Sequence, residues 1–295
     1  MSARALLLYN PEARHAPDPA TLTRIRRRVE WGGLAVEAVA SKAPGDLSRL
    51  AALAEAEGFD RVVICGGDGS VREAAQGLKG SPVPLAIIPM GTANVLSREI
   101  GLPSRRPIEC AAIAGSGKPR PVTLGEVAGV GVFTFCASAG IDSLAVKTVD
   151  LKMKRETGAW AYVHAGLMGL LEQQIPLFNV ELPSGKIFRA QQVLALNASH
   201  YGLGSFHISR GASLEAPTIR MFALAPPLMA RLSLVSSCLL GKGVEDGPGV
   251  VWADVDSFSI SAEEPFPVQA DGDAIGSTPC TVKAAPRALN LVFPE

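Results

Sequence analysis

The first hundred residues alternate between short hydrophobic runs and segments in which apolar residues recur every three or four positions. Hydrophobic runs of this kind predict strands, here at residues 5–9, 34–39, 61–65 and 85–88. The spaced segments predict amphipathic helices, at residues 21–31, 47–54 and 70–79. This β–α–β–α order predicts a Rossmann-like α/β domain with a mostly parallel sheet and right-handed crossovers.

After about residue 121 the pattern changes to short hydrophobic runs separated by turn residues. We expect strands at residues 122–127, 132–136, 178–182, 188–196, 219–224, 250–255, 258–261 and 280–283. Such a series predicts an antiparallel β-sandwich or barrel, and therefore a second domain. Two further segments, 160–171 and 227–240, are apolar almost all round. Helices of that kind lie in a core, in an acyl-chain pocket or at a membrane-facing surface, and the pattern leaves these alternatives open.

A glycine-rich stretch follows the third predicted strand. Three glycines surround Asp68 in the segment 66–69, and Ser70 with Glu73 has the spacing of a capping box, which predicts a helix starting at Ser70. A strand, a glycine turn and a helix N-terminus together present backbone N–H groups to a phosphate. Arg72 stands where a dinucleotide fingerprint would need glycine. Taken alone, the stretch could equally be a tight turn. The Asp68 carboxylate would repel a phosphate beside it unless a metal or a proton lies between them.

A second loop of the same type follows the fourth predicted strand, at residues 89–96. Gly91 permits an unusual turn, Thr92 can cap the next helix, and Asn94 offers a donor and an acceptor near the helix start. In parallel sheets, ligands bind at the carboxyl ends of the strands. Two glycine-led helix starts on neighbouring strands favour a shared phosphate site over two unrelated caps.

Composition narrows the class of protein. Among 295 residues, 47% are hydrophobic and Lys plus Arg balance Asp plus Glu at 28 each, which favours a globular protein and offers no argument for nucleic-acid binding. The chain lacks a signal-peptide pattern and a run long enough to span a membrane. Five scattered cysteines indicate reduced thiols in a cytoplasmic protein, and the four histidines have no metal-ligand spacing.

Five motifs in order resemble the catalytic domain shared by diacylglycerol kinases, sphingosine kinases and related bacterial lipid kinases. These motifs are Asn10-Pro11, Gly66-Gly67-Asp68-Gly69-Ser70, Pro89-Met90-Gly91-Thr92-Ala93-Asn94, Gly140-Ile141-Asp142 and Asp271-Gly272-Asp273. The resemblance covers nearly the whole chain. It implies a nucleotide-binding domain at residues 1–121 with a returning strand at 285–295, a lipid-binding β-sandwich at 122–284, and an ATP cleft between them.

The resemblance also implies roles for individual residues. Nucleotide contacts are implied for Asn10, Ser41, Gly66, Gly67, Asp68, Gly69, Ser70, Val71, Arg72, Gly91, Thr92 and Asn94. Asp142 is similar to an aspartate that hydrogen-bonds a lipid headgroup, and Lys154 and Arg155 to basic residues that approach the phosphates. Asp68, Asp271 and Asp273 are the carboxylates available for a metal and for the catalytic base, and the sequence does not divide these tasks among them.

The chain departs from the family pattern at four places, one of which is the segment near Asn197, where the family's run of glycines is missing. Asp273 stands where the family has glutamate, which shortens the reach of that carboxylate by one methylene. Glu12-Ala13-Arg14 replaces a loop of small residues and glycine. Residues 214–217 lack the Asp-Asp-Gly that holds a structural magnesium in bacterial members, and only Glu215 remains there.

These observations predict an ATP- and Mg²⁺-dependent lipid kinase that acts on a hydroxyl of a diacylglycerol-like or sphingoid lipid. The expected partners are the lipid, a membrane surface that the cytoplasmic protein contacts transiently, and a second copy of the chain as a homodimer. Two alternatives remain. An NAD kinase-like enzyme would share the nucleotide domain, and a catalytically degenerate member would bind lipid or nucleotide without turnover.

Overall fold

A computed structural model describes residues 3–13, 15–148, 175–201, 206–225 and 243–294. The chain divides into two compact units, one formed by Met1–Val122 with Arg287–Glu295 and the other by Thr123–Pro286. The sequence placed the divisions at 121/122 and 284/285.

The first unit contains a parallel sheet in the order β2-β1-β3-β4. Its strands are β1 (Ala3–Tyr9), β2 (Leu34–Ala40), β3 (Arg61–Gly66) and β4 (Leu85–Pro89). Every residue from Val62 to Gly66 is buried, as expected for an uncharged strand covered on both faces. The predicted parallel α/β domain is therefore confirmed.

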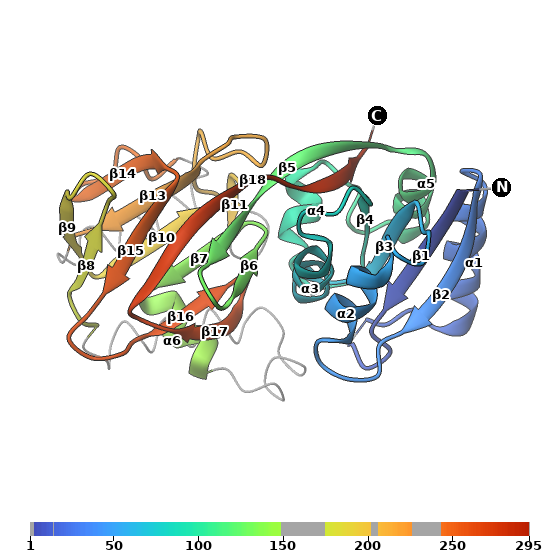
Figure 1. The fold of residues 1–295 in the computed structure, drawn as a ribbon, viewed down its shortest axis with the longest axis horizontal. Helices are drawn as coiled ribbons and strands as arrows, with labels where there is room; N and C mark the ends of the chain where they lie inside the picture. The colour runs from blue at the N-terminus through green and yellow to red at the C-terminus, as the bar shows by residue number, and fades with distance from the viewer. Residues whose placement is uncertain (1–2, 14, 149–174, 202–205, 226–242, 295) are drawn as a thin grey trace. The chain divides into compact units, whose positions relative to one another are not determined.

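Helices cover this sheet on both faces. The first unit contains α1 (Pro19–Glu30), α2 (Asp46–Leu53), α3 (Asp68–Leu78), α4 (Val95–Glu99) and α5 (Pro107–Ser116). The chain crosses the sheet in one direction from β1 to β2 and in the opposite direction from β2 to β3 and from β3 to β4. Because such crossovers are right-handed, α1 lies on the face opposite α2 and α3. Accordingly α1 packs against α5, and α2 packs against α3 (Figure 1).

The end of the chain returns to the first unit. The last strand, β18 (Cys280–Phe293), places Leu291 parallel to Leu85 of β4. Around residue 287, where φ of Arg287 is +54°, the strand passes from the second unit to the first. The returning strand that the family resemblance implied is thus present, as part of a longer strand.

The second unit is an antiparallel sandwich, as predicted. One sheet has the order β14-β13-β10-β7-β16-β17, and the other runs β18-β15-β8-β9, with β5 and β6 attached through β18. The strands are β5 (Lys118–Val127), β6 (Gly131–Phe133), β7 (Cys136–Ala139), β8 (Phe178–Glu181), β9 (Ile187–Ala190), β10 (Gln192–Leu196), β13 (Ile219–Leu224), β14 (Val250–Val255), β15 (Ser257–Ser261), β16 (Pro267–Ala270) and β17 (Asp273–Ser277). A short helix, α6 (Ile141–Thr148), follows β7, and β11 (His200–Tyr201) pairs with β12 (Phe206–His207).

Apolar side chains from both sheets form one core in the second unit. Phe178 and Phe258 come from one sheet, Val193 and Met221 from the other, and all four are fully buried. At roughly 25 cal/mol per Å² of apolar area, each such side chain contributes about 2 kcal/mol on burial. The sandwich is therefore stabilised by its own core.

Some expectations fall on parts of the chain outside the described residues. These include the apolar segments at 160–171 and 227–240, and the basic residues Lys154 and Arg155. Within the described ranges, no helix combines the length and apolarity needed to cross a membrane. Four cysteines are described and all are free, and burial raises the pKa of the Cys65 thiol to about 12.

Candidate active site

The predicted nucleotide-binding residues follow strands that end at the same edge of the parallel sheet. Tyr9 lies beside both Ala40 and Cys65, and Gly66 lies beside Pro89. The loops after β1, β2, β3 and β4 therefore begin at neighbouring points. This edge is where ligands bind in open parallel sheets.

The glycine loop after β3 leads directly into α3. The helix begins at Asp68, with Gly67 at the N-cap in extended conformation, and no side chain forms a capping hydrogen bond. The predicted start at Ser70 with a capping box is therefore wrong. Ser70 instead packs on Gly66, where an added Cβ would lie 2.5 Å from the Ser70 Cβ. Without a side-chain cap, the first turn of α3 offers its N–H groups and its partial positive charge to an anion.

The two glycine loops contact each other through their backbones. A Cβ added at Gly91 would lie 2.5 Å from the Cα of Gly67 and 2.7 Å from Oδ1 of Asn94. Only glycine allows this approach without displacing main chain. The predicted shared site thus has a structural basis, because the loops after β3 and β4 form one surface.

Asn94 fixes the shape of the second loop. Its Oδ1 accepts a hydrogen bond from the Gly91 N–H at 2.9 Å, and its Nδ2 donates to the Gly91 carbonyl at 2.8 Å. Asn94 is also the N-cap of α4, in left-handed conformation with φ of 50°, so the expectation that Thr92 caps this helix is wrong. Asparagine tolerates this conformation better than most residues. Asn94 therefore shapes the loop, while Thr92 is exposed.

A hydrogen bond from the protein stabilises the Asp68 carboxylate, the anion within the glycine loop. Its Oδ1 accepts a hydrogen bond of 3.4 Å from the backbone N–H of Leu96, in the first turn of α4. A carboxylate at a helix N-terminus is favourable, because it balances the positive end of the helix. Asp68 therefore links the start of α3 to the start of α4.

The first two loops contribute Asn10 and Ser41. The Asn10 Oδ1 accepts a hydrogen bond from the Glu12 N–H at 2.9 Å, which forms a local turn. Ser41 is tied to β1 through its own N–H, which donates to the Tyr9 carbonyl at 2.9 Å. Both residues are half-buried at the same edge as the glycine loops.

In the second unit, Asp271-Gly272 forms the two-residue turn between β16 and β17. Ala270 pairs with Asp273 across the hairpin, and φ is +50° at Asp271 and +84° at Gly272. Positive φ at both central residues is typical of a type I′ turn, for which Asp-Gly is a favoured sequence.

The Asp271 carboxylate is enclosed by donors from the β6–β7 connection. Oδ2 accepts hydrogen bonds from the N–H and hydroxyl of Thr134, at 2.6 and 2.9 Å. Oδ1 accepts from the N–H groups of Phe135 and Cys136, both at 3.0 Å. Burial raises the pKa of Asp271, and these four hydrogen bonds oppose the rise. Since both oxygens are used in this way, the geometry favours a structural role for Asp271 in anchoring the turn.

Asp273 differs from Asp271 in its surroundings. It is half-buried at the start of β17, two residues beyond the anchored aspartate. The anchoring of Asp271 therefore fixes the backbone from which Asp273 projects. Of these two carboxylates, Asp273 is the one that the turn leaves closer to solvent.

Asp142, at the start of α6, is the centre of a polar network. Its Oδ1 accepts hydrogen bonds from Nε2 of Gln192 at 2.8 Å and from the Ser143 N–H at 2.9 Å. Its Oδ2 accepts from the hydroxyls of Ser138 and Tyr201. The carboxylate is thus held in one orientation by side chains from β7, β10 and β11.

Sequence reasoning did not find Ser138, Gln192, Tyr201 or Gln269, which surround Asp142. Gln192 and Gln269 are buried polar residues within otherwise apolar strands, at 3% exposure each. A buried amide requires hydrogen-bond partners, so a glutamine inside an apolar strand is a signal of a polar cluster. That signal does not say which residue is the partner.

Two protein-family models together match nearly the whole chain. The model of the diacylglycerol kinase catalytic domain matches residues 4–127, and the model of the YegS C-terminal NAD kinase beta sandwich-like domain matches residues 136–293. The chain belongs to the diacylglycerol kinase and YegS-like lipid kinase family.

Individual proteins are similar to this chain over most of its length. A diacylglycerol kinase of Bacillus subtilis is 25% identical over 298 residues, covering 99% of this chain and 97% of that protein. An uncharacterised Synechocystis protein is 27% identical over 245 residues, or 81% of this chain and 56% of that protein. A solved protein from Bacillus anthracis superposes with a TM-score of 0.83 at 22% identity, covering 99% and 96% of the two chains, which shows the shared fold.

The family implies ATP as the phosphoryl donor, and the glycine loops fit a phosphate. No side chain caps the first turn of α3, and Gly67 approaches Gly91 closely at the same edge of the sheet. Backbone N–H groups at a helix N-terminus bind phosphate in this kind of arrangement. Among the described residues, no group of three or more His, Cys, Asp or Glu side chains could cage a metal. Mg²⁺ characteristically binds through one or two carboxylates plus substrate phosphates, and Asp68 is the carboxylate within this loop.

The family's structural magnesium does not fit this chain. Glu215 is exposed, and the carbonyls of Leu214 and Ala216 accept hydrogen bonds from the N–H and hydroxyl of Thr123, at 2.7 and 2.5 Å. The Arg220 guanidinium lies beside Gly211, where an added Cβ would meet Nη1 at 2.3 Å.

Arg220 forms a partly buried ionic cluster with Glu245 and Asp254. Its guanidinium donates to Glu245 at 3.3 Å and to both oxygens of Asp254 at 2.7 Å. Burial alone would raise the pKa of Glu245, but hydrogen bonds from Ser209, Arg210 and Arg220 outweigh it and lower the pKa. A lowered pKa means that Glu245 stabilises the fold at neutral pH, and that this contribution is lost as the pH falls through the folded-state pKa.

We expect Arg220→Met to destabilise the protein by about 2–3 kcal/mol, because the Glu245 carboxylate, 8% exposed, loses its cation and keeps only the hydrogen bonds from Ser209 and Arg210. Urea unfolding would measure the loss. Arg210→Met is the matched control, since the Arg210 guanidinium forms an exposed ion pair with Asp246 and should cost no more than about 1 kcal/mol. Equal losses in the two variants would contradict the assignment of Arg220 as the buried cation of the cluster.

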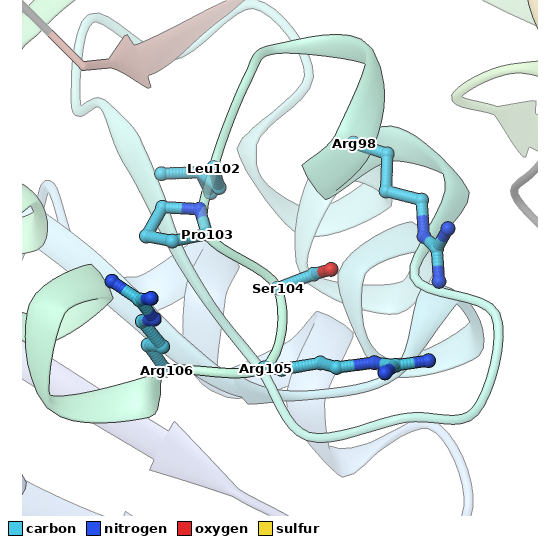
Figure 2. Close-up of a pocket in the computed structure, with 6 residues that line it drawn as sticks. All are labelled: Arg98, Leu102, Pro103, Ser104, Arg105 and Arg106. Carbon is cyan, nitrogen blue, oxygen red and sulfur yellow. The ribbon is translucent and has the colours of Figure 1, made fainter.

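A separate basic hollow of about 330 Å³ lies where α4 connects to α5. It is lined by Arg98, Leu102, Pro103, Ser104, Arg105 and Arg106. Figure 2 shows the guanidinium groups of Arg98 and Arg105 on the same side of this connection as the Ser104 hydroxyl, whereas Arg106 points away. None of the predicted nucleotide or lipid residues lines it.

Proposed function

We propose that this protein is an ATP-dependent lipid kinase that phosphorylates a hydroxyl of a diacylglycerol-like or sphingoid lipid. The observation that carries the proposal is the joined pair of glycine loops at Gly67 and Gly91, with an uncapped helix N-terminus beside them. Membership of a lipid kinase family and the polar cluster around Asp142 in the β-sandwich unit support a lipid acceptor.

In this proposal, the backbone of residues 67–70 and 91–94 binds the phosphates of the nucleotide. Asp68 holds the two helix starts together and would be a carboxylate ligand for Mg²⁺, a cation that would offset the charge of the phosphates. Asp142 accepts a hydrogen bond from the lipid headgroup. The headgroup thereby joins the hydrogen-bond network around Asp142, to which the Tyr201 hydroxyl also donates. Asp273 takes the proton from the attacking hydroxyl as general base. Phosphoryl transfer needs chiefly such positioning and charge neutralisation.

The test is incubation of the purified protein with Mg²⁺, labelled ATP and a panel of neutral lipids that includes diacylglycerol and sphingosine. A labelled phospholipid is expected, and Asp68→Ala should remove it while the circular dichroism spectrum stays unchanged. No product across the panel, with ATP still bound, would overturn the proposal. Phosphorylation of NAD in place of lipid would identify an NAD kinase-like enzyme.

A second candidate is a lipid-binding protein without turnover. The observation in its favour is that Asp142 already has hydrogen bonds to both of its oxygens from within the protein. Native mass spectrometry showing co-purified lipid, together with no ATP consumption, would select this function.

A further inference from the structure

Gln269 occupies an unusual place in the β-sandwich unit. It lies in β16 opposite Ser138 of β7, and the register of β16 with β17 shifts between Val268 and Gln269. Such a bulge redirects the side chains that follow it. Gln269 is 3% exposed, so both ends of its amide must find partners inside the protein.

The two ends of this amide reach two different parts of the site. Its Nε2 donates to the Ser138 hydroxyl at 2.7 Å and lies 3.4 Å from Oδ2 of Asp142. Its Oε1 accepts a hydrogen bond from the Gly272 N–H at 2.9 Å. The orientation of the amide follows from chemistry, because a carboxylate only accepts and a backbone N–H only donates.

Gln269 is therefore a direct bridge between Asp142 and the Asp271-Gly272 turn. Asp142 has a second glutamine partner, but Gln192 uses its Oε1 for the Ile141 N–H at 2.9 Å and so holds only the start of α6. The two glutamines thus differ in one respect. Both orient Asp142, and Gln269 also holds the turn.

We propose that Gln269 is a positioning residue that sets the place of Asp273 relative to Asp142. This inference rests on the proposed function, in which Asp142 receives the lipid headgroup and Asp273 is the base. A hydroxyl must lie within about 3 Å of its base, so a small shift of the turn impairs proton transfer. Because aspartate is one methylene shorter than glutamate, the backbone at residue 273 must be placed more accurately for the carboxylate to reach the hydroxyl.

The first test measures the bridge without any lipid. In Gln269→Leu, hydrogen exchange of the Gly272 amide should accelerate about 10-fold, the effect of losing one buried hydrogen bond, while exchange in the strands of the core is unchanged. Gln192→Leu is the matched control, because it also removes a partner of Asp142 and leaves Gly272 bonded. Equal exchange of Gly272 in wild type and Gln269→Leu would overturn the bridge. So would acceleration of the same size in Gln192→Leu.

The second test measures turnover with the lipid that the wild-type enzyme uses. Gln269→Leu should lower kcat about 10- to 100-fold at unchanged ATP affinity, because proton transfer by a positioned group contributes on that scale or above. Gln192→Leu should act mainly on the KM for lipid, since it does not touch the turn. A change in KM alone for Gln269→Leu would overturn its positioning role.

Gln269→Glu adds a signature that a loss of packing would not produce. Above its pKa the new carboxylate cannot donate to Ser138 or Asp142, and it repels Asp142. Once protonated, this side chain can donate again. The kcat of Gln269→Glu relative to that of wild type should therefore rise as the pH falls. A pH-independent ratio would contradict the proposal. If wild type phosphorylates no lipid, the proposed function fails, and the exchange experiment still decides whether Gln269 holds the turn.

Discussion

Asp273→Ala is expected to lower kcat for lipid phosphorylation about 100- to 10,000-fold, the range that a general base supplies. Affinity for ATP should be unchanged, because in the proposed function Asp273 acts on the lipid hydroxyl, whereas the backbone of residues 67–70 and 91–94 binds the phosphates. Steady-state kinetics with isothermal titration of nucleotide would measure both quantities. Asp273→Glu should retain turnover, since it restores the carboxylate on a longer arm.

Asp271→Ala is the matched comparison, because it removes a carboxylate two residues away in the same hairpin. It leaves the N–H groups of Thr134, Phe135 and Cys136 buried without their acceptor, so we expect a loss of about 3 kcal/mol or more in unfolding free energy. Asp273→Ala should change that free energy by less than about 1 kcal/mol. A stable Asp271→Ala without turnover would contradict this division and make Asp271 the catalytic residue.

Gly91→Ala is expected to weaken ATP binding about 10- to 100-fold, because phosphate binding depends on the contact between the two loops. The new methyl group would lie 2.5 Å from the Cα of Gly67, so the backbones must separate or Asn94 must release Gly91. Overpacking of this kind also costs about 1–3 kcal/mol of stability. Isothermal titration and thermal unfolding would measure the two effects.

Gly276→Ala provides the control for this substitution. A Cβ added at Gly276, in β17, would meet no atom closer than 3.9 Å, so the same chemical change should leave both ATP affinity and stability near wild type. An ATP affinity in Gly91→Ala equal to that of Gly276→Ala would show that nucleotide binding does not depend on the joined loops.

Local sequence predicted the elements but not all of their boundaries. The strands of the parallel sheet and the helices between them follow from hydrophobic spacing, and the observed β3, Arg61–Gly66, ends one residue after the expected end at Cys65. The start of α3 was placed two residues too late, because Ser70 and Glu73 have the spacing of a capping box. In the structure Ser70 packs on Gly66, and a contact with the preceding strand outweighs the local signal.

The candidate site was predicted as a set of motifs, and the structure shows that residues of one motif have different surroundings. The family resemblance matched Asp273 to the position of the base, and the sequence left the tasks of Asp271 and Asp273 undivided. In the structure Asp271 is buried among donors from residues 134–136 and Asp273 is half-buried. Gln269 carried no motif. Its partners lie 131 and 3 residues away, in two different elements.

By itself the sequence determined the α/β and β-sandwich classes, the glycine loops and the family, because hydrophobic period and glycine position are local properties of a chain. Only the tertiary structure decided that Gly67 contacts Gly91, that Asp271 anchors a turn, and that Gln269 joins this turn to Asp142. The reason is physical. Each of these facts depends on hydrogen bonds or close contacts between segments distant in sequence, which only the packed fold brings together.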